Sequence, residues 1–287
     1  MLSLLTIEQE KSMYIRERYV AGQTIITREK MKRTVDKCMK RAPREKTTSE
    51  KVWRNNLRYA IFRLTLILNT NFKPGDHLLT LTYKTEPSKK EAEKILKAFL
   101  DGIRRECQKE GIELKRVAVT ERVGTRLHHH IVCSNIPFRI IRKCWPHGTV
   151  FHKPLWDYPN YADLASYLLK QAAALHMENG DISKKRYTTS RNIVIPEGKE
   201  EIISRKNIED EPQSLKDYQI DQDSVQVYEN ELTDTICREY IMVSTRETPR
   251  LKRWSKGRTA RGERINYTKA MREAYKEIQG TIEELIL

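Results

Sequence analysis

The chain has 287 residues, of which 38% are hydrophobic and 32% are charged, so it can bury a core beneath an extensively solvated surface. Its formal net charge of +15 points to a polyanionic partner, nucleic acid before membrane. No apolar run approaches the roughly 18 residues of a membrane span, and the five cysteines show no paired spacing, so we expect a cytoplasmic protein with reduced thiols, no signal peptide and no membrane partner.

Charge is distributed unevenly along the chain. Residues 11–58 hold 15 Lys or Arg against 5 Asp or Glu, whereas residues 197–247 hold 14 acidic against 6 basic side chains. The first of these segments and the basic stretch 249–264 are expected to contact phosphates. The pattern predicts four regions: a basic helical N-terminal region over 1–72, a globular domain over 73–195, an acidic accessory region over 196–247, and a basic linker with a C-terminal helix over 248–287.

The N-terminal part of the chain is expected to be helical. Residues 5–42 look like a basic helix interrupted at Gly22, and a second helix is predicted over 49–69, where apolar residues recur near helical spacing. Residues 77–83, His-Leu-Leu-Thr-Leu-Thr-Tyr, alternate and are rich in strand-forming types. We therefore predict that the first strand of the globular domain begins at residue 77.

The elements that follow indicate an α+β fold. Ser88 and Glu91 form the capping box of a helix that runs to about residue 109. The remaining elements are predicted as strands over 114–121 and 128–132 joined by a turn at Gly124-Thr125, a short helix over 137–145, a strand over 148–155 and a helix over 160–177. The order β-α-β-β-α-β is the ferredoxin-like arrangement, an antiparallel sheet with helices on one face. Its other face is then expected to be open for a ligand such as DNA.

Three consecutive histidines make the most informative pattern. Side chains alternate along a strand, so His128 and His130 share one face and His129 points to the other. The predicted turn pairs Glu121 opposite His128 on the same face, with Cβ atoms roughly 5 Å apart. Two imidazoles and one carboxylate placed in this way can bind a divalent metal, for which His129 should be dispensable. A half-buried strand with a polar outer face remains the alternative.

A tyrosine and a lysine follow on the last predicted helix of the domain. Tyr167 and Lys170 are three residues apart and share a helix face. A nearby ammonium favours the phenolate of a tyrosine, whose ordinary pKa is about 10, and a divalent metal polarises a phosphate. Alone, the pair is typical of any amphipathic helix, but with the histidine hairpin it predicts transesterification on DNA. Tyr161 lies about 120° further around the helix, so it is a poor second nucleophile and is interpreted as a packing residue.

His128-x-His130 followed by Tyr167-x-x-Lys170 resembles the HUH endonucleases, specifically the rolling-circle replication initiators of bacterial plasmids and phages. The similarity extends to the motifs Leu79-Thr-Leu-Thr-Tyr83, Trp145-Pro-His-Gly148, Trp53-x-x-Asn56, Asn71-Phe72 and Ser190-Arg-Asn192. One departure is His129, which stands where the family usually has a bulky apolar residue.

The resemblance implies a ferredoxin-like HUH endonuclease domain over 73–195 with helical N- and C-terminal extensions. The metal ligands would be His128, His130 and Glu121, and the metal would be Mg²⁺ or Mn²⁺. Tyr167 would attack single-stranded origin DNA to form a 5′-phosphotyrosine, assisted by Lys170, and the strand would later be rejoined.

The implied partners are single-stranded origin DNA and a separate helicase in the bacterial cytoplasm, since the chain has no G-x-x-x-x-G-K-[ST] motif for ATP hydrolysis. A single-tyrosine transposase and a relaxase are alternatives within the class. A relaxase would have its tyrosine before the histidines, and Tyr14 and Tyr19, in the predicted N-terminal helix, fit that role poorly. A basic DNA-binding protein without catalytic activity is the alternative from another class.

Overall fold

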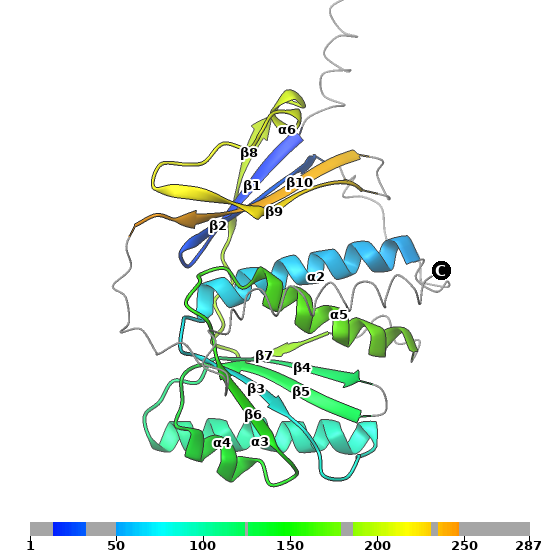
Figure 1. The fold of residues 1–287 in the computed structure, drawn as a ribbon, viewed down its shortest axis with the longest axis vertical. Coiled ribbons are helices and arrows are strands. Elements are labelled where there is room, and N and C mark those ends of the chain that lie inside the picture. The colour runs from blue at the N-terminus through cyan, green and yellow to red at the C-terminus, as the bar shows by residue number, and fades with distance from the viewer. Residues whose placement is uncertain (1–13, 33–49, 124–125, 179–185, 231–234, 247–287) are drawn as a thin grey trace, which may run out of the picture. The chain divides into compact units, whose positions relative to one another are not determined.

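A computed structural model of the protein describes residues 14–32, 50–123, 126–178, 186–230 and 235–246. Within these residues the fold is α+β, with two five-stranded antiparallel sheets and five helices (Figure 1). The first sheet has the strand order β8-β1-β2-β10-β9, and the second sheet has the order β6-β3-β5-β4-β7. No helix in these segments is long and apolar enough to cross a membrane.

The second sheet has the ferredoxin-like arrangement that the sequence predicts. Along the chain it is built from β3 (His77–Leu81), α3 (Lys89–Lys109), β4 (Arg116–Val123), β5 (Arg126–Cys133), α4 (Phe138–Cys144) and β6 (Val150–Pro154). The short strand β7 (Thr188–Thr189) extends the sheet beside β4. The predicted capping box starts α3: the Ser88 side chain accepts from the backbone N–H of Glu91, and the Glu91 carboxylate accepts from that of Ser88.

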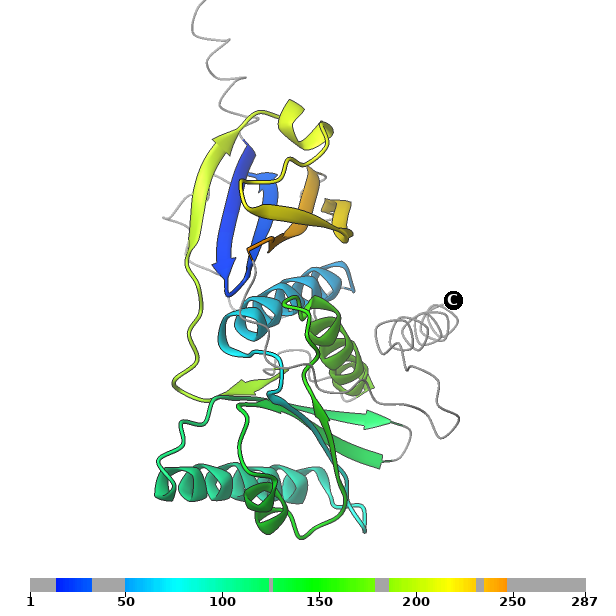
Figure 2. The ribbon, with the colours of Figure 1, turned by 60° about the vertical axis from the view of Figure 1, so that its left-hand side comes forward.

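Helices cover both faces of the second sheet. As predicted, α3 and α4 pack on one face. The expectation of an open opposite face is wrong over β4 and β5, because α2 (Glu50–Asn71) and α5 (Ala162–Glu178) lie there (Figures 1 and 2). Both helices carry an apolar side that must be buried. The shared core on this face includes Leu64, Leu68, Val117, Val119, Val132, Leu164 and Leu168.

Residues 14–31 form a β-hairpin, so the prediction of a basic helix here is wrong. β1 (Tyr14–Ala21) pairs antiparallel with β2 (Thr24–Met31). Both strands are rich in β-branched and aromatic residues, and this preference for strands outweighs the basic composition. The turn needs a glycine: Gly22 has a φ of +60°, and a Cβ there would lie 2.2 Å from the carbonyl oxygen of Asn69. Of the helices predicted within 1–72, the described residues contain the second one, as α2.

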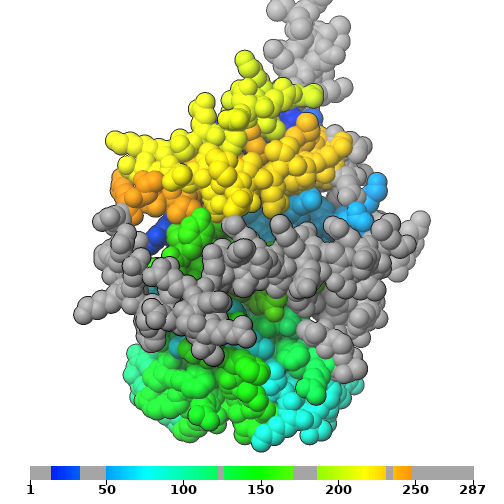
Figure 3. All heavy atoms as spheres, in the orientation of Figure 1, coloured from blue at the N-terminus to red at the C-terminus, as the bar shows by residue number. Residues whose placement is uncertain are grey.

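The first sheet joins this hairpin to the acidic region. That region supplies β8 (Gly198–Ile203), α6 (Lys206–Glu209), β9 (Tyr218–Asn230) and β10 (Thr235–Ser244). β8 pairs with β1 and β10 pairs with β2, and residues 198–230, yellow in Figure 3, form much of the visible surface of this sheet. Basic side chains of the hairpin therefore meet carboxylates, as Arg18 meets Glu201 at 2.8 Å. The acidic region thus completes a sheet that the basic hairpin begins.

A buried asparagine links the first sheet to the helices that cover the second. The side-chain N–H of Asn69 donates to Thr24 Oγ1 at 2.9 Å, and Asn69 Oδ1 accepts from the backbone N–H of Tyr161 at 2.9 Å. Phe62 and Leu66 of α2 also pack into an apolar cluster with residues of β1, β2 and β10. These contacts fix the beginning of α5, the helix that carries the predicted nucleophile.

Two sequence predictions lie outside the described residues. They are the basic linker with its C-terminal helix over 248–287, including the basic stretch 249–264, and part of the basic segment 11–58.

The ion pairs of Glu29 generate a stability prediction. This fully buried carboxylate meets Arg16 Nε at 2.6 Å and Arg238 Nε at 2.8 Å, and Arg238 is itself 2% exposed. Glu29→Gln leaves a buried guanidinium without its counter-charge, so urea unfolding followed by circular dichroism should show a loss of about 3–5 kcal/mol. The matched control is Glu201→Gln, at a half-exposed partner of Arg18, which should cost at most about 1 kcal/mol. Similar losses in the two variants would contradict this assignment.

Candidate active site

The β4–β5 hairpin has the register that the sequence predicts. Glu121 is paired with His128, and Val119 is paired with His130. Because directly paired residues point to the same face of a sheet, the two histidines and Glu121 lie on the face covered by α2 and α5. His129 is paired with Thr120 and lies on the opposite face. The hairpin therefore brings together the three residues predicted as metal ligands.

One residue from each neighbouring strand holds His130. Its Nε2 is hydrogen-bonded to Glu121 Oε1, and its Nδ1 lies 3.1 Å from the hydroxyl of Thr80 on β3. The side chains of His130 and Glu121 are 5% and 4% exposed. An ionised carboxylate only accepts, so Nε2 carries the proton and donates to Glu121, while Nδ1 accepts from Thr80. Both nitrogens of this buried imidazole are thus satisfied, which fixes the orientation of the ring.

Helix α5 places Tyr167 beside this imidazole. The centroids of the Tyr167 and His130 rings are 5.7 Å apart, and the rings meet edge to face. Burial, and then the negative charge of Glu121, raise the pKa of Tyr167 from 10.0 to about 12. The phenol is therefore neutral at neutral pH in this arrangement. Lys170 is half-buried one turn further along α5, so the tyrosine and the lysine keep the predicted spacing on one helix.

The donor atoms of this site fit a divalent cation. Glu121 Oε2 and His128 Nδ1 are buried, and neither has a hydrogen-bond partner in the part of the chain that the structure describes. Carboxylate oxygen suits Mg²⁺ and Mn²⁺, whereas imidazole nitrogen suits softer metals. Among the described residues no three His, Cys, Asp or Glu side chains are already arranged to hold a metal, and Glu121 is hydrogen-bonded to His130. Metal binding therefore requires these two residues to exchange that bond for ligation.

His129 belongs to the opposite core. It is 1% exposed, with the Tyr83 hydroxyl 2.6 Å from Nε2 and the Thr120 hydroxyl 2.9 Å from Nδ1. Its ring also packs edge to face with Trp145. Burial, with a smaller contribution from the neighbouring histidines, lowers the pKa of His129 to about 4, so the ring is neutral. The prediction that this side chain points away from His128 and His130 is confirmed.

Tyr161 is a packing residue, as the sequence predicts. It is 1% exposed, lies in the core between α2, α5 and the second sheet, and stacks against Trp156. Burial raises the pKa of its phenol well above the ordinary value. Nothing in this position gives Tyr161 access to a substrate.

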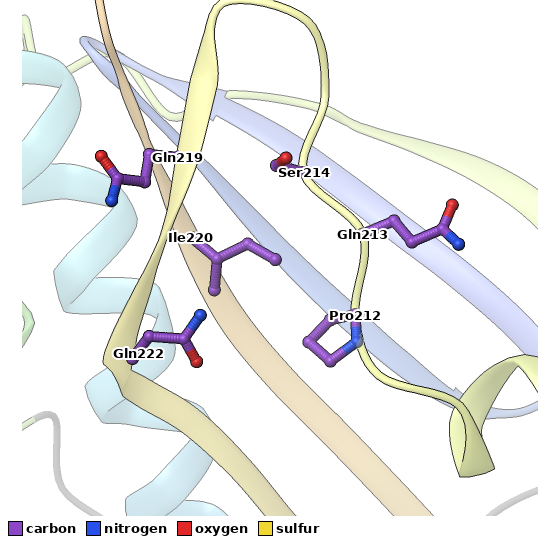
Figure 4. Close-up of a pocket in the computed structure, with 6 residues that line it drawn as sticks. All are labelled: Pro212, Gln213, Ser214, Gln219, Ile220 and Gln222. Carbon is purple, nitrogen blue, oxygen red and sulfur yellow. The ribbon is translucent and has the colours of Figure 1, made fainter.

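A separate hollow of about 400 Å³ lies on the first sheet. It is lined by Pro212, Gln213, Ser214, Gln219, Ile220 and Gln222 (Figure 4). The side chains that line it include no acid or base, so Ser214 has no partner there to activate its hydroxyl. The groups suited to phosphate chemistry are therefore those of the second sheet.

Thr80 is a site residue that the sequence analysis missed. It lies in the motif Leu79-Thr-Leu-Thr-Tyr83, between the buried Leu79 and Leu81, so alternation alone assigns it to the other face of the strand. Its cross-strand partner is His130. The alternation was visible in the sequence, but the pairing of β3 with β5 joins segments about 50 residues apart and leaves no local signal.

The hydrogen bond of Thr80 makes a prediction about His130. Thr80→Val keeps the shape of the side chain but removes the hydroxyl, which leaves Nδ1 of a buried imidazole unpaired. We expect the free energy of unfolding to fall by about 1–3 kcal/mol, measured by urea denaturation. Thr80→Ser restores the hydroxyl and should lose no more than about 1 kcal/mol, the contribution of one methyl group. A serine variant as unstable as the valine variant would show that the hydroxyl does not hold the ring.

Comparison with known proteins identifies the segment that contains this site. Residues 76–173 match a family model described as Replication-associated protein, of the ORF2 type. Neither a curated protein nor a solved structure matches the chain. The matched segment begins just before β3 and ends within α5, so it includes Glu121, His128, His130, Tyr167 and Lys170. The match supports a role in the initiation of replication. Residues 76–173 thus form a domain of this replication-associated protein family.

Proposed function

We propose that the protein initiates rolling-circle replication by nicking single-stranded origin DNA, with Tyr167 as the nucleophile. The observation that carries the proposal is the contact of the Tyr167 ring with His130, whose Nε2 in turn meets Glu121. A tyrosine from one helix, a histidine and a carboxylate from two strands are thereby gathered on one face. The family match of residues 76–173 supports the replication role.

In the proposed reaction, the hydroxyl oxygen of Tyr167 attacks the phosphorus of the scissile phosphodiester. The bond from phosphorus to the 3′-oxygen breaks as the phosphotyrosine bond forms, and the phenolic proton ends on the departing 3′-oxygen. One phosphodiester replaces another, so the bond energy is retained. Reversal of the step by a free 3′-hydroxyl therefore rejoins the strand without ATP, while unwinding is left to a separate helicase.

The other site residues have roles that follow from their positions. Glu121, His128 and His130 would hold Mg²⁺ or Mn²⁺, and a cation held there supplies polarisation and orientation of the scissile phosphate. The Glu121 carboxylate raises the pKa of Tyr167, so ligation of that carboxylate favours the phenolate. Lys170 would act in the same direction through its ammonium. Thr80, 3.1 Å from His130 Nδ1, keeps the opposite nitrogen turned toward Glu121.

The relaxase alternative does not fit the fold. Its nucleophile would precede the histidines, and the candidates are Tyr14 and Tyr19. Both lie on β1 in the first sheet, not in the predicted helix, and the Tyr19 ring packs against Phe62 with a centroid distance of 5.2 Å. These tyrosines serve the core of the first sheet rather than the histidine site.

A covalent adduct tests the nucleophile. With Mn²⁺ and single-stranded oligonucleotides that tile the DNA around its gene, the protein should retain the 3′-labelled fragment through SDS electrophoresis, since attack leaves the tyrosine on the 5′-phosphate. The 5′-labelled fragment should be released with a 3′-hydroxyl that a polymerase extends. Tyr167→Phe should abolish the adduct, whereas Tyr161→Phe, which removes a buried hydroxyl outside the site, should preserve it. An adduct formed by Tyr167→Phe would assign the chemistry to another residue.

Calorimetric titration with Mn²⁺ tests the ligand set. Glu121→Ala removes a ligand outright, so the affinity should fall by more than about tenfold, the smaller loss that outer partners of a metal site already cause. Glu113→Ala removes the same charge from an exposed position ahead of β4 and should leave the affinity unchanged. Circular dichroism of both variants controls for folding. Equal affinities in the two variants would remove Glu121 from the ligand set.

A further inference from the structure

A single row of side chains crosses the second sheet through the candidate site. Phe151 on β6 is paired with Thr80 on β3, Thr80 is paired with His130 on β5, and His130 is paired with Val119 on β4. Paired residues share a face, so all four side chains point to the side that carries Tyr167. Adjacent strands are about 4.8 Å apart, which places Phe151 roughly 10 Å from His130 along the sheet.

This row runs from the covered interior to an open edge. His130 is 5% exposed, whereas Phe151 is 57% exposed, although both lie on the same face. β6 is an edge strand, and Phe151 does not belong to the core formed beneath α2 and α5. Lys153, two residues further along β6, is exposed on the same face, opposite Leu78. The open part of the site face is therefore an aromatic ring and an ammonium side by side.

We propose that Phe151 and Lys153 bind the single-stranded DNA substrate next to the scissile phosphate, with Phe151 stacking on a base and Lys153 contacting the backbone. An exposed aromatic ring beside a cation is the combination that proteins use to bind single strands without reading sequence. Duplex DNA cannot stack on such a ring because its bases already stack on each other. The chain's formal net charge of +15 favours the same partner.

The inference rests on the proposed function for the identity of the substrate, but its test needs no chemistry. Binding is measured in the full-length Tyr167→Phe variant, which is expected to bind without cleaving. The probe is a fluorescein-labelled oligothymidylate 20-mer, followed by fluorescence anisotropy. In this background Phe151→Ala and Phe151→Leu should weaken binding by about 5- to 100-fold, whereas Phe151→Trp should bind at least as well as the parent. The leucine variant separates stacking from simple apolar contact.

The matched control is Phe138→Ala. Phe138 is also an exposed phenylalanine, but it lies on α4 at the opposite face of the same sheet, so its loss should leave the affinity unchanged. An unchanged affinity for Phe151→Ala, a leucine variant that binds as the parent does, or an equal loss in Phe138→Ala would each overturn the stacking role. An affinity that rises in Phe151→Ala would overturn it too and would indicate that another segment covers the ring.

Salt dependence tests Lys153. Removal of one phosphate contact to a single strand should reduce the slope of log K against log salt by about 0.7. Lys199→Ala, at an exposed lysine on the edge strand β8 of the first sheet, should leave the slope unchanged. Equal slopes for Lys153→Ala and the parent would overturn the backbone contact. Weakened binding by the Phe151 variants alongside a failed adduct assay would reject the nicking reaction and keep the binding surface.

Discussion

The site depends on one buried imidazole whose two nitrogens must be satisfied from two different strands. His130 is almost excluded from water, so Thr80 on β3 and Glu121 on β4 supply its hydrogen-bond partners. Side chains alternate along a strand, so a slip of one residue in the pairing of β5 would turn His130 away from both partners. The same slip would turn Val132 out of the core beneath α2 and α5 and Ile131 out of the core beneath α3 and α4. The geometry of the polar site is therefore enforced by the apolar packing on both sides of the sheet.

The run of three histidines serves two cores at once. The strand period that brings His128 and His130 to the site sends His129 into the cluster with Trp145, where its neutral ring bridges the hydroxyls of Tyr83 and Thr120. A bulky apolar residue, which is usual at this place in the HUH endonucleases, would fill the same volume but leave both hydroxyls without the ring as a partner. The histidine and the two hydroxyls are thus matched to each other, and the departure from the usual pattern has a structural reason away from the metal ligands.

Patterns of short range predicted the site better than the fold around it. The alternation of β5, the pairing of Glu121 with His128, and the capping box at Ser88 all depend on residues within about ten positions of each other. The hairpin over 14–31 was predicted as a helix because its strands are completed by β8 and β10, from the far end of the described chain. Such distant partners leave no local signature. The same limit explains why the helices over the site face, and the contact between Thr80 and His130, were not foreseen.

Burial has two opposing effects on the proposed nucleophile. The helices that exclude water from β4 and β5, together with Glu121, raise the pKa of Tyr167 to about 12 and keep the phenol protonated in the resting protein. In the same surroundings of low dielectric, a positive charge close to the phenol acts more strongly than it would in water. A reactive phenolate would therefore form only when ligands and substrate are in place. A strand of DNA that crossed the layer of α2 and α5 would have to break the core that fixes Tyr167, whereas a strand that enters over β6 would leave it intact. The covered face that replaces the expected open sheet thus confines entry to the edge that carries Phe151 and Lys153.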